Sequence, residues 1–167
     1  SNTKFRKNPG GWPTRFIVGE EFIGDTPVCL VLGDSVFFGQ GFRETLQSIS
    51  KNITGAAIFG YYVPNPKEYG VVEFDRNGKV LSLEEKPKEP KSNYAVPGLY
   101  FYDSSVISYA KTLKPSQRGE LEITDLNSLY LHRGELKVHL LGRGFTWLDT
   151  GTYEGLANAA DFVRTIQ

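Results

Sequence analysis

The stretch VCLVLGDSVFFG, residues 28–39, is an apolar run that breaks at Gly33, presents one acid, Asp34, and then becomes apolar again. A run of this length is typical of a buried strand, and the Gly-Asp pair marks the point where the chain leaves the sheet. Ligands bind at the carboxyl ends of strands in open α/β sheets, because the loops there diverge into a crevice. Asp34 is therefore either the cap of a turn or part of a ligand site at that edge.

Composition limits the class of protein. The chain has 167 residues, of which 40% are hydrophobic, and this is enough for one sizeable core. Its 19 basic and 19 acidic residues cancel, so no long-range field favours nucleic acid or an anionic membrane. No run approaches the ~20 apolar residues of a spanning helix, and the start does not resemble a signal peptide. The single cysteine, Cys29, is expected to be a reduced core residue, and the protein is expected to be cytoplasmic.

Helix-like and strand-like segments alternate along the chain. After the strand expected at 28–33, residues 41–52 have an amphipathic helical pattern, and residues 56–63 form a second apolar strand. A β-α-β order of this kind is typical of α/β folds and predicts parallel pairing of the two strands.

The strongest turn signal is Asn77-Gly78. It lies between strand-like runs at 69–74 and 79–87, which predicts a β-hairpin that can project beyond the sheet. The remaining expected elements are a strand at 93–103, helices at 105–113 and 123–134, strands at 135–142 and 145–149, and a helix at 152–167 capped by Thr152.

A second acid follows a strand-like run near the end of the chain. The segment FTWLDTG, residues 145–151, repeats the pattern of LVLGDS, with Asp149 at the end of an apolar strand. If the two strands are neighbours, Asp34 and Asp149 can each give one oxygen to a hard cation such as Mg²⁺ and leave its other positions to water and phosphate. Asp149 can equally be a turn residue beside Thr150, so both interpretations stay open.

Charged residues end another expected strand in SLEEKPKEP, residues 82–90. Lys86 can bind a phosphate as a compact cation and Glu85 can accept hydrogen bonds from a sugar, or the run can be a solvated surface. Tyr69 and Gly70 can offer a ring and a backbone group to a sugar, or can simply start a strand. Zinc, acyl-transfer and nucleic-acid sites lack their sequence signatures.

Five segments, taken in order, form a recognisable set: FIVGEEFIGD, LVLGDSVFFG, EYGVVEFDRNGKVLSLEEKPKEPKSNYAVPGLYFYD, RGELEITDLN and GRGFTWLDTGT. The set resembles the glucose-1-phosphate thymidylyltransferases, which make dTDP-glucose for dTDP-rhamnose, lipopolysaccharide and other deoxysugar pathways. The resemblance implies an α/β, Rossmann-like nucleotide-diphospho-sugar transferase fold with a mixed, mostly parallel sheet, a projecting β-hairpin and its N-terminal strands missing. We expect residues 16–167 to form a single (partial) nucleotidyltransferase domain, and residues 1–15 to be a poorly matched leader.

The resemblance also implies an activity and its site residues. The activity is nucleotidyl transfer from dTTP to α-D-glucose 1-phosphate, which gives dTDP-glucose and pyrophosphate, with Mg²⁺ and typically in a homotetramer. The catalytic residues by this likeness are Asp34 and Asp149, as metal ligands, and Lys86. The substrate contacts by this likeness are Gly11, beside the base, and Tyr69, Gly70, Glu85, Lys86 and Val96, with Arg118 and Arg143 as further positive charges.

Departures from the family pattern keep a second function open. The family's Gly-rich loop, of the form G-x-G-T-R-L, cradles a triphosphate through backbone N–H groups and has no match in this sequence. GGWPTRF, residues 10–16, stands where the family carries a Gly-Leu-Ala-Gln-Ala-like stretch. The alternative is a non-catalytic remnant that binds a sugar nucleotide or associates with partner subunits; a glycosyltransferase is a weaker third reading, because GDSV lacks a D-x-D spacing. Missing strands would expose a sheet edge, which predicts a homo-oligomer.

Overall fold

The computed structural model of the chain describes residues 10–151, so the helix expected at 152–167 lies outside the described residues. The strands are β1 (Val28–Val31), β2 (Ser35–Gly39), β3 (Ala56–Tyr62), β4 (Gly70–Phe74), β5 (Val80–Glu85), β6 (Tyr94–Ala95), β7 (Leu99–Tyr102), β8 (Leu136–Leu141) and β9 (Phe145–Asp149). The helices are α1 (Trp12–Val18), α2 (Glu20–Ile23), α3 (Phe42–Lys51), α4 (Val106–Thr112) and α5 (Ile123–His132), with a short 3-10 helix at Pro66–Glu68. None of the helices between residues 10 and 151 has the length and hydropathy that a membrane-spanning segment needs.

The main sheet is mostly antiparallel, and the expectation of a mostly parallel sheet is wrong. Its order is β1-β7-β3-β6-β4-β5, with β8 on the other side of β3. Among the described strand pairs, only β3 with β8 is parallel. β1 and β3, which correspond to the two strands expected to pair in parallel, do not pair, because β7 lies antiparallel between them. Since β7 comes from a distant part of the chain, the local β-α-β pattern could not reveal this insertion.

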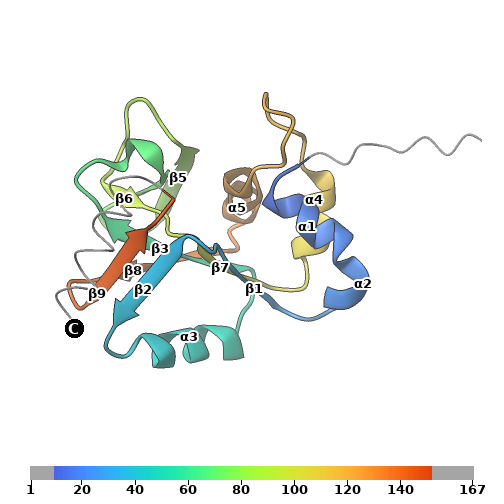
Figure 1. Cartoon of the computed structure of the whole chain (residues 1–167), viewed down its shortest axis with the longest axis horizontal. Coiled ribbons are helices and arrows are strands. Elements are labelled where there is room, and N and C mark those ends of the chain that lie inside the picture. The colour runs from blue at the N-terminus through green and yellow to red at the C-terminus, as the bar shows by residue number, and fades with distance from the viewer. Residues whose placement is uncertain (1–9, 152–167) are drawn as a thin grey trace, which may run out of the picture.

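Helices cover the two faces of the sheet (Figure 1). On one face, α1, α4 and α5 enclose a core in which Tyr102 and Tyr130 are fully buried. On the other face, the ring of Phe42 in α3 packs against that of Phe59 in β3, with ring centroids 6.5 Å apart. The buried cluster beneath α3 draws on β3, β7 and β8 but not on β1. Cys29 in β1 is exposed as a result, so the expectation of a core cysteine is wrong.

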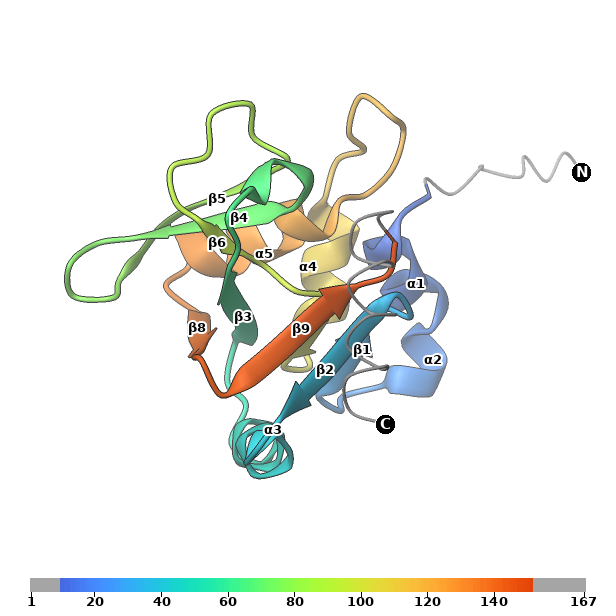
Figure 2. The ribbon, with the colours of Figure 1, turned by 60° about the vertical axis from the view of Figure 1, so that its left-hand side comes forward.

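The predicted hairpin is confirmed. β4 and β5 pair antiparallel, and Gly78 in their turn has a φ of 80°, a conformation that favours glycine. The Asp75 carboxylate accepts hydrogen bonds from the backbone N–H groups of Asn77 (2.8 Å) and Lys79 (3.0 Å), which closes the turn. Figure 2 shows this turn extending away from the rest of the molecule, while the other end of the hairpin lies near α5.

The segment 94–102 changes register beside β3. Ala95 of β6 pairs with Tyr61, whereas Phe101 of β7 pairs with Ala57. Between these two pairs the segment advances by six residues, whereas β3 advances by four. The segment therefore has two residues more than β3 over this stretch, and it must bulge out of the sheet between β6 and β7.

The resulting bulge, residues 96–98, joins the ends of other strands. The Val96 N–H donates a hydrogen bond to the carbonyl of Gly70 at the start of β4 (2.8 Å). The Leu32 N–H, just after β1, donates to the carbonyl of Gly98 (2.8 Å). The bulge thus fixes the ends of β1 and β4 beside one another.

A buried hydrogen bond ties α5 to the sheet. The Tyr102 hydroxyl donates to the side-chain oxygen of Asn127 (2.6 Å), and these residues are 0% and 2% exposed. We expect Tyr102→Phe to lower the free energy of unfolding by about 1–3 kcal/mol, because the Asn127 oxygen loses its partner in the core. Urea unfolding measures this loss. The matched control, Tyr62→Phe, removes the same hydroxyl from a ring that is 60% exposed, and a change within about 0.5 kcal/mol is expected. Equal losses in the two variants would contradict the prediction.

Candidate active site

Asp34 and Asp149 lie together because β2 pairs with β9. These strands form a separate antiparallel ribbon in which Ser35 is opposite Asp149. The backbone N–H of Thr150 donates to the carbonyl of Asp34 (2.7 Å), which extends the pairing past the strand ends. The expected meeting of the two acids is therefore right, but the strand involved is β2, which follows Asp34, and not the apolar run at 28–33.

The two carboxylates point at the same space beside Gly151. A Cβ built on Gly151 would lie 2.6 Å from Asp34 Oδ2 and 3.1 Å from Asp149 Oδ1. The Gly151 N–H donates to Asp149 Oδ1 (2.9 Å), which orients that carboxylate. In the part of the chain that the structure describes, no third acidic, histidine or cysteine side chain completes a metal cluster around them. This donor set fits Mg²⁺, which is bound by one or two carboxylates and takes its other ligands from water and phosphate.

A cavity of about 330 Å³ extends from these acids to the hairpin and the start of α5. Its volume falls in the range of small-molecule sites. The cavity is lined by all of the substrate and metal residues expected from the sequence, namely Gly11, Asp34, Tyr69, Gly70, Glu85, Lys86, Val96 and Asp149. Arg118 also lines it, whereas Arg143 lies in the turn between β8 and β9, outside the cavity.

The open end of the hairpin supplies one wall. Gly70 at the start of β4 is opposite Glu85 at the end of β5, and the Lys86 N–H donates to the carbonyl of Tyr69 (3.0 Å). A Cβ on Gly70 would lie 3.4 Å from Glu85 Oε2, so the glycine leaves the Glu85 carboxylate room to move and to be reached. Antiparallel pairing therefore brings two segments fifteen residues apart, at Gly70 and Glu85, into one wall.

Lys86 has an unusual backbone conformation. Its φ is 44°, the one positive φ outside glycine in residues 10–151. A side chain in this left-handed region costs about 1–2 kcal/mol, because Cβ approaches the following carbonyl. Such strain collects at ligand sites, where the surrounding structure holds it in place.

Thr124 and Asn127 of α5 line the cavity but were not expected from the sequence. The Thr124 hydroxyl donates to Glu85 Oε2 (2.6 Å), so α5 holds the carboxylate at the end of the hairpin. Tyr100 lies beside them, and burial, followed by the nearby charges of Glu85 and Asp34, raises the pKa of its hydroxyl. Thr124, Asn127 and Tyr100 thus add neutral polar groups around the Glu85 carboxylate.

Trp147 links the acids to the hairpin. Its ring packs edge-on against Tyr69, with ring centroids 5.2 Å apart, and its Nε1–H donates to the hydroxyl of Ser35 (3.3 Å). Trp147 stands two residues before Asp149 on β9, so both side chains lie on the same face of the strand. That spacing was the signal in the sequence that could have identified Trp147.

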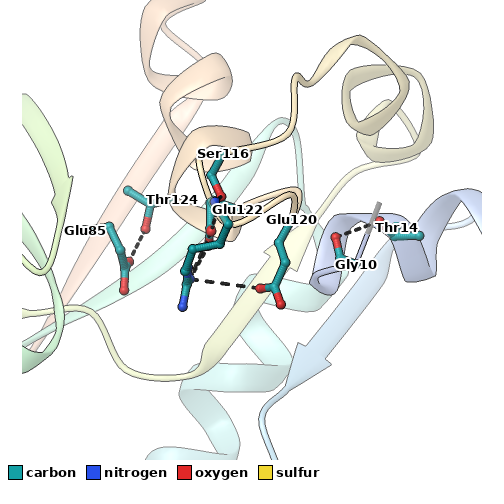
Figure 3. A network of polar contacts seen from close by, with 8 residues as sticks. Gly10, Thr14, Glu85, Ser116, Glu120, Glu122 and Thr124 are labelled. Carbon is teal, nitrogen blue, oxygen red and sulfur yellow. Dashed lines mark hydrogen bonds and ion pairs between the residues drawn. The ribbon is translucent and has the colours of Figure 1, made fainter. Parts of the chain in front are cut away.

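The loop between α4 and α5 carries Arg118, which lines the cavity, and Figure 3 shows Ser116, Glu120 and Glu122 near it in the chain. The guanidinium donates to both oxygens of Glu122, and the hydroxyl of Ser116 donates to one of them. These contacts with Glu122, and after them the charge of Glu120, raise the pKa of Arg118. Arg118 is thus a fully ionised group held by carboxylates of its own loop.

Gly11 closes the cavity beside this loop. Its φ is 99°, and a Cβ there would overlap the carbonyl oxygen of Leu121, so only glycine fits. The N–H of Leu121 donates to the carbonyl of Gly10 (2.7 Å), which ties the segment before α1 to the segment before α5.

Comparison with known proteins identifies the family of this chain. The family model described as Nucleotidyl transferase matches residues 2–166. A glucose-1-phosphate thymidylyltransferase from Neisseria meningitidis is 57% identical over 160 residues, which are 96% of this chain and 56% of the relative. One from Mycolicibacterium smegmatis is 54% identical over 162 residues, 97% of this chain and 56% of the relative. The chain spans just over half the length of these curated relatives.

Solved structures show the fold. A crystal structure from Bacillus anthracis, assigned as a glucose-1-phosphate thymidylyltransferase in complex with a sucrose, matches with a TM-score of 0.83 at 40% identity, over 97% of this chain and 64% of that one. A UDP-glucose pyrophosphorylase complexed with UDP-glucose matches with a TM-score of 0.81 over 97% of this chain and 64% of that one, and at 21% identity it is similar in fold alone. The Rossmann-like nucleotidyltransferase fold expected from the sequence is confirmed, apart from its strand directions. The chain belongs to the nucleotidyl transferase family, and its curated relatives at 52–57% identity are glucose-1-phosphate thymidylyltransferases.

Proposed function

We propose that this chain carries the sugar-phosphate and metal side of a site for nucleotidyl transfer. The substrates are dTTP and α-D-glucose 1-phosphate, and the products are dTDP-glucose and pyrophosphate. The observation that supports this function is the single cavity that combines two converging carboxylates, Asp34 and Asp149, with Lys86 and the polar end of the hairpin. By likeness to its relatives, the reaction serves dTDP-rhamnose and lipopolysaccharide synthesis in the cytoplasm.

The reaction is a displacement at phosphorus. An oxygen of the sugar phosphate forms a bond to the α-phosphorus of dTTP, and the bond from that phosphorus to the bridging oxygen breaks, so that pyrophosphate leaves with the electron pair. The attacking oxygen is already anionic at neutral pH, so no strong general base is needed. The protein therefore acts by positioning the reactants and by stabilising negative charge.

The residues that line the cavity have different roles in this reaction. Lys86 neutralises the sugar phosphate, and Glu85, held by Thr124, accepts hydrogen bonds from sugar hydroxyls. The ring of Tyr69 forms a wall beside the sugar, and Gly70 leaves space next to Glu85. Asp34 and Asp149 would hold Mg²⁺, which when bound neutralises charge on the phosphates.

Calorimetric titration tests this function. The probes are glucose 1-phosphate, dTDP-glucose and dTTP, each with and without Mg²⁺, followed by a pyrophosphate-release assay. We expect glucose 1-phosphate to bind, and Mg²⁺ to tighten the binding of both nucleotides. Asp34→Asn should abolish this effect of Mg²⁺, because one of the two converging carboxylates is lost.

Asp25→Asn is the matched control, since Asp25 is an exposed acid in the loop before β1. This variant should keep the effect of Mg²⁺. Binding without pyrophosphate release would favour the alternative of a non-catalytic sugar-nucleotide-binding protein. Failure of all three ligands to bind would overturn the proposal.

Lys86→Gly separates binding from stability. We expect the dissociation constant for glucose 1-phosphate to rise by about tenfold or more, because a charge-assisted contact to phosphate is lost. The free energy of unfolding should stay the same or rise by up to about 1 kcal/mol, because glycine accepts the positive φ of this position at lower cost. Calorimetry and urea unfolding of one sample measure both quantities. Unchanged affinity would remove Lys86 from the proposed site.

We also propose that the chain self-associates. Among the described strands, β1 pairs on one edge only, and Val31 in β1 is 52% exposed. An open apolar edge of this kind favours strand addition from another chain. We expect light scattering to give a mass of at least twice the 18.7 kDa of one chain, and Val31→Lys to lower it. Val18→Lys, at a residue 72% exposed on α1 and outside the sheet, should leave it unchanged, and a monodisperse monomer at high concentration would contradict the proposal.

A further inference from the structure

We propose that Glu122 is a positioning residue, which fixes the guanidinium of Arg118 at the cavity wall so that it can bind the phosphate of the sugar substrate. This inference rests on the proposed function, because the ligand of Arg118 is the sugar phosphate. It assigns a role to a carboxylate whose charge, taken alone, would repel an anionic ligand.

The contact between the two side chains has good geometry. Arg118 Nη2 donates to Glu122 Oε1 at 2.9 Å and to Oε2 at 3.2 Å (Figure 3). Glu120, the other acid of the loop, lies 4.0 Å from the same nitrogen, at the limit of an ion pair. Glu122 is therefore the carboxylate that sets the orientation of the guanidinium.

Glu122 is the fixed partner of the pair. Its side chain is 19% exposed, whereas that of Arg118 is 66% exposed. The hydroxyl of Ser116 donates to Glu122 Oε1 at 2.8 Å, so a second group holds the carboxylate. A long exposed arginine is thus tied to an anchor that cannot easily move.

The loop that carries these side chains is itself closed. The N–H of Ser116 donates to the carbonyl of Glu120 (2.7 Å), and the N–H of Gly119 donates to the carbonyl of Ser116 (2.8 Å). Gly119 has a φ of 76°, which lets the chain reverse within this short span. The backbone under Arg118 is therefore held on both sides of it.

Arg118 keeps donors for a ligand. Its contacts with Glu122 and Glu120 all use Nη2, so within the described residues Nη1 and Nε can still donate. The guanidinium lines the same cavity as Lys86. A planar arginine with two donors and a lysine point charge form a recurrent pair for phosphate.

Glu122 has two opposing effects on such a ligand. Its charge weakens the positive potential of Arg118, while its hydrogen bonds limit the conformations of that side chain. Because Arg118 is mostly exposed, solvent screens the first effect, and we infer that the second dominates. The two effects predict opposite changes in the affinity for the phosphate ligand when the charge of Glu122 is removed.

Calorimetric titration of this chain with glucose 1-phosphate shows whether the affinity falls or rises when the charge of Glu122 is removed. We expect Glu122→Gln to raise the dissociation constant about fivefold, because a neutral amide offers Nη2 one acceptor oxygen in place of two charged ones, and Ser116→Ala to raise it less. Glu120→Gln removes the same charge from the same loop without a good hydrogen bond, and it should leave the affinity equal or tighter. Unchanged or tighter binding by Glu122→Gln would overturn the positioning role.

A double-mutant cycle identifies the residue through which Glu122 acts. In the Arg118→Lys background, Glu122→Gln should have no further effect on affinity, because the guanidinium that Glu122 orients is absent. Additive losses in the two variants would show that Glu122 does not act through Arg118.

An NMR measurement without ligand separates this inference from the proposed function. We expect the Arg118 Nε–H signal, assigned by its loss in Arg118→Lys, to show restricted motion in the wild-type chain and fast motion in Glu122→Gln. If glucose 1-phosphate fails to bind the wild-type chain, the proposed function is overturned, while this change in motion still supports the positioning of Arg118. Equal motion in the two proteins would overturn it.

Discussion

The pairing of β2 with β9 determines where both acids of the site lie. Asp34 and Asp149 are far apart in the sequence, and the register that puts Ser35 opposite Asp149 brings them to one end of the ribbon. A slip of one residue would turn Asp149 to the other face. The buried ring of Trp147 opposes such a slip, because it packs between Tyr61 and Tyr69 and is 7% exposed. Packing of an aromatic ring thus protects the geometry of a charged site.

Local sequence signals predicted most of the elements, and the residues expected at the site line one cavity. The hairpin could be identified from Asn77-Gly78, because that turn depends on backbone preferences of adjacent residues. The pairing of strands could not, because β7 lies between β1 and β3 and no local pattern records which distant segment inserts there. The same limit explains Cys29, whose exposure depends on how far α3 extends over the sheet. Asp34 lies beside Asp149 as expected, but the strand that brings it there is β2 and not the run before it, because a short apolar run after a turn gives a weak strand signal.

The residues that sequence reasoning missed are those that act on other side chains. Thr124 holds Glu85, Ser116 holds Glu122, and Glu122 holds Arg118. Each contact joins ordinary polar residue types at spacings without a known motif. Their meaning appears only when α5 and the loop before it are placed against the hairpin, so the positioning groups of this site are a property of the tertiary structure.

The charge of the cavity provides the last link between geometry and function. Six carboxylates and two cationic side chains line it: Asp34, Glu68, Glu85, Glu120, Glu122 and Asp149, with Lys86 and Arg118. The chain as a whole has a formal net charge of zero, so the positive charge that balances this acidic lining lies on residues outside the cavity. Burial is the main cause of the raised pKa of Tyr100, and the negative charges of Glu85 and Asp34 add to it. The acidic lining weakens the attraction of Lys86 and Arg118 for phosphates, and a divalent cation held by the two carboxylates beside Gly151 would offset this effect. The charge of the lining thus supports the proposed metal site on grounds that are separate from the family resemblance.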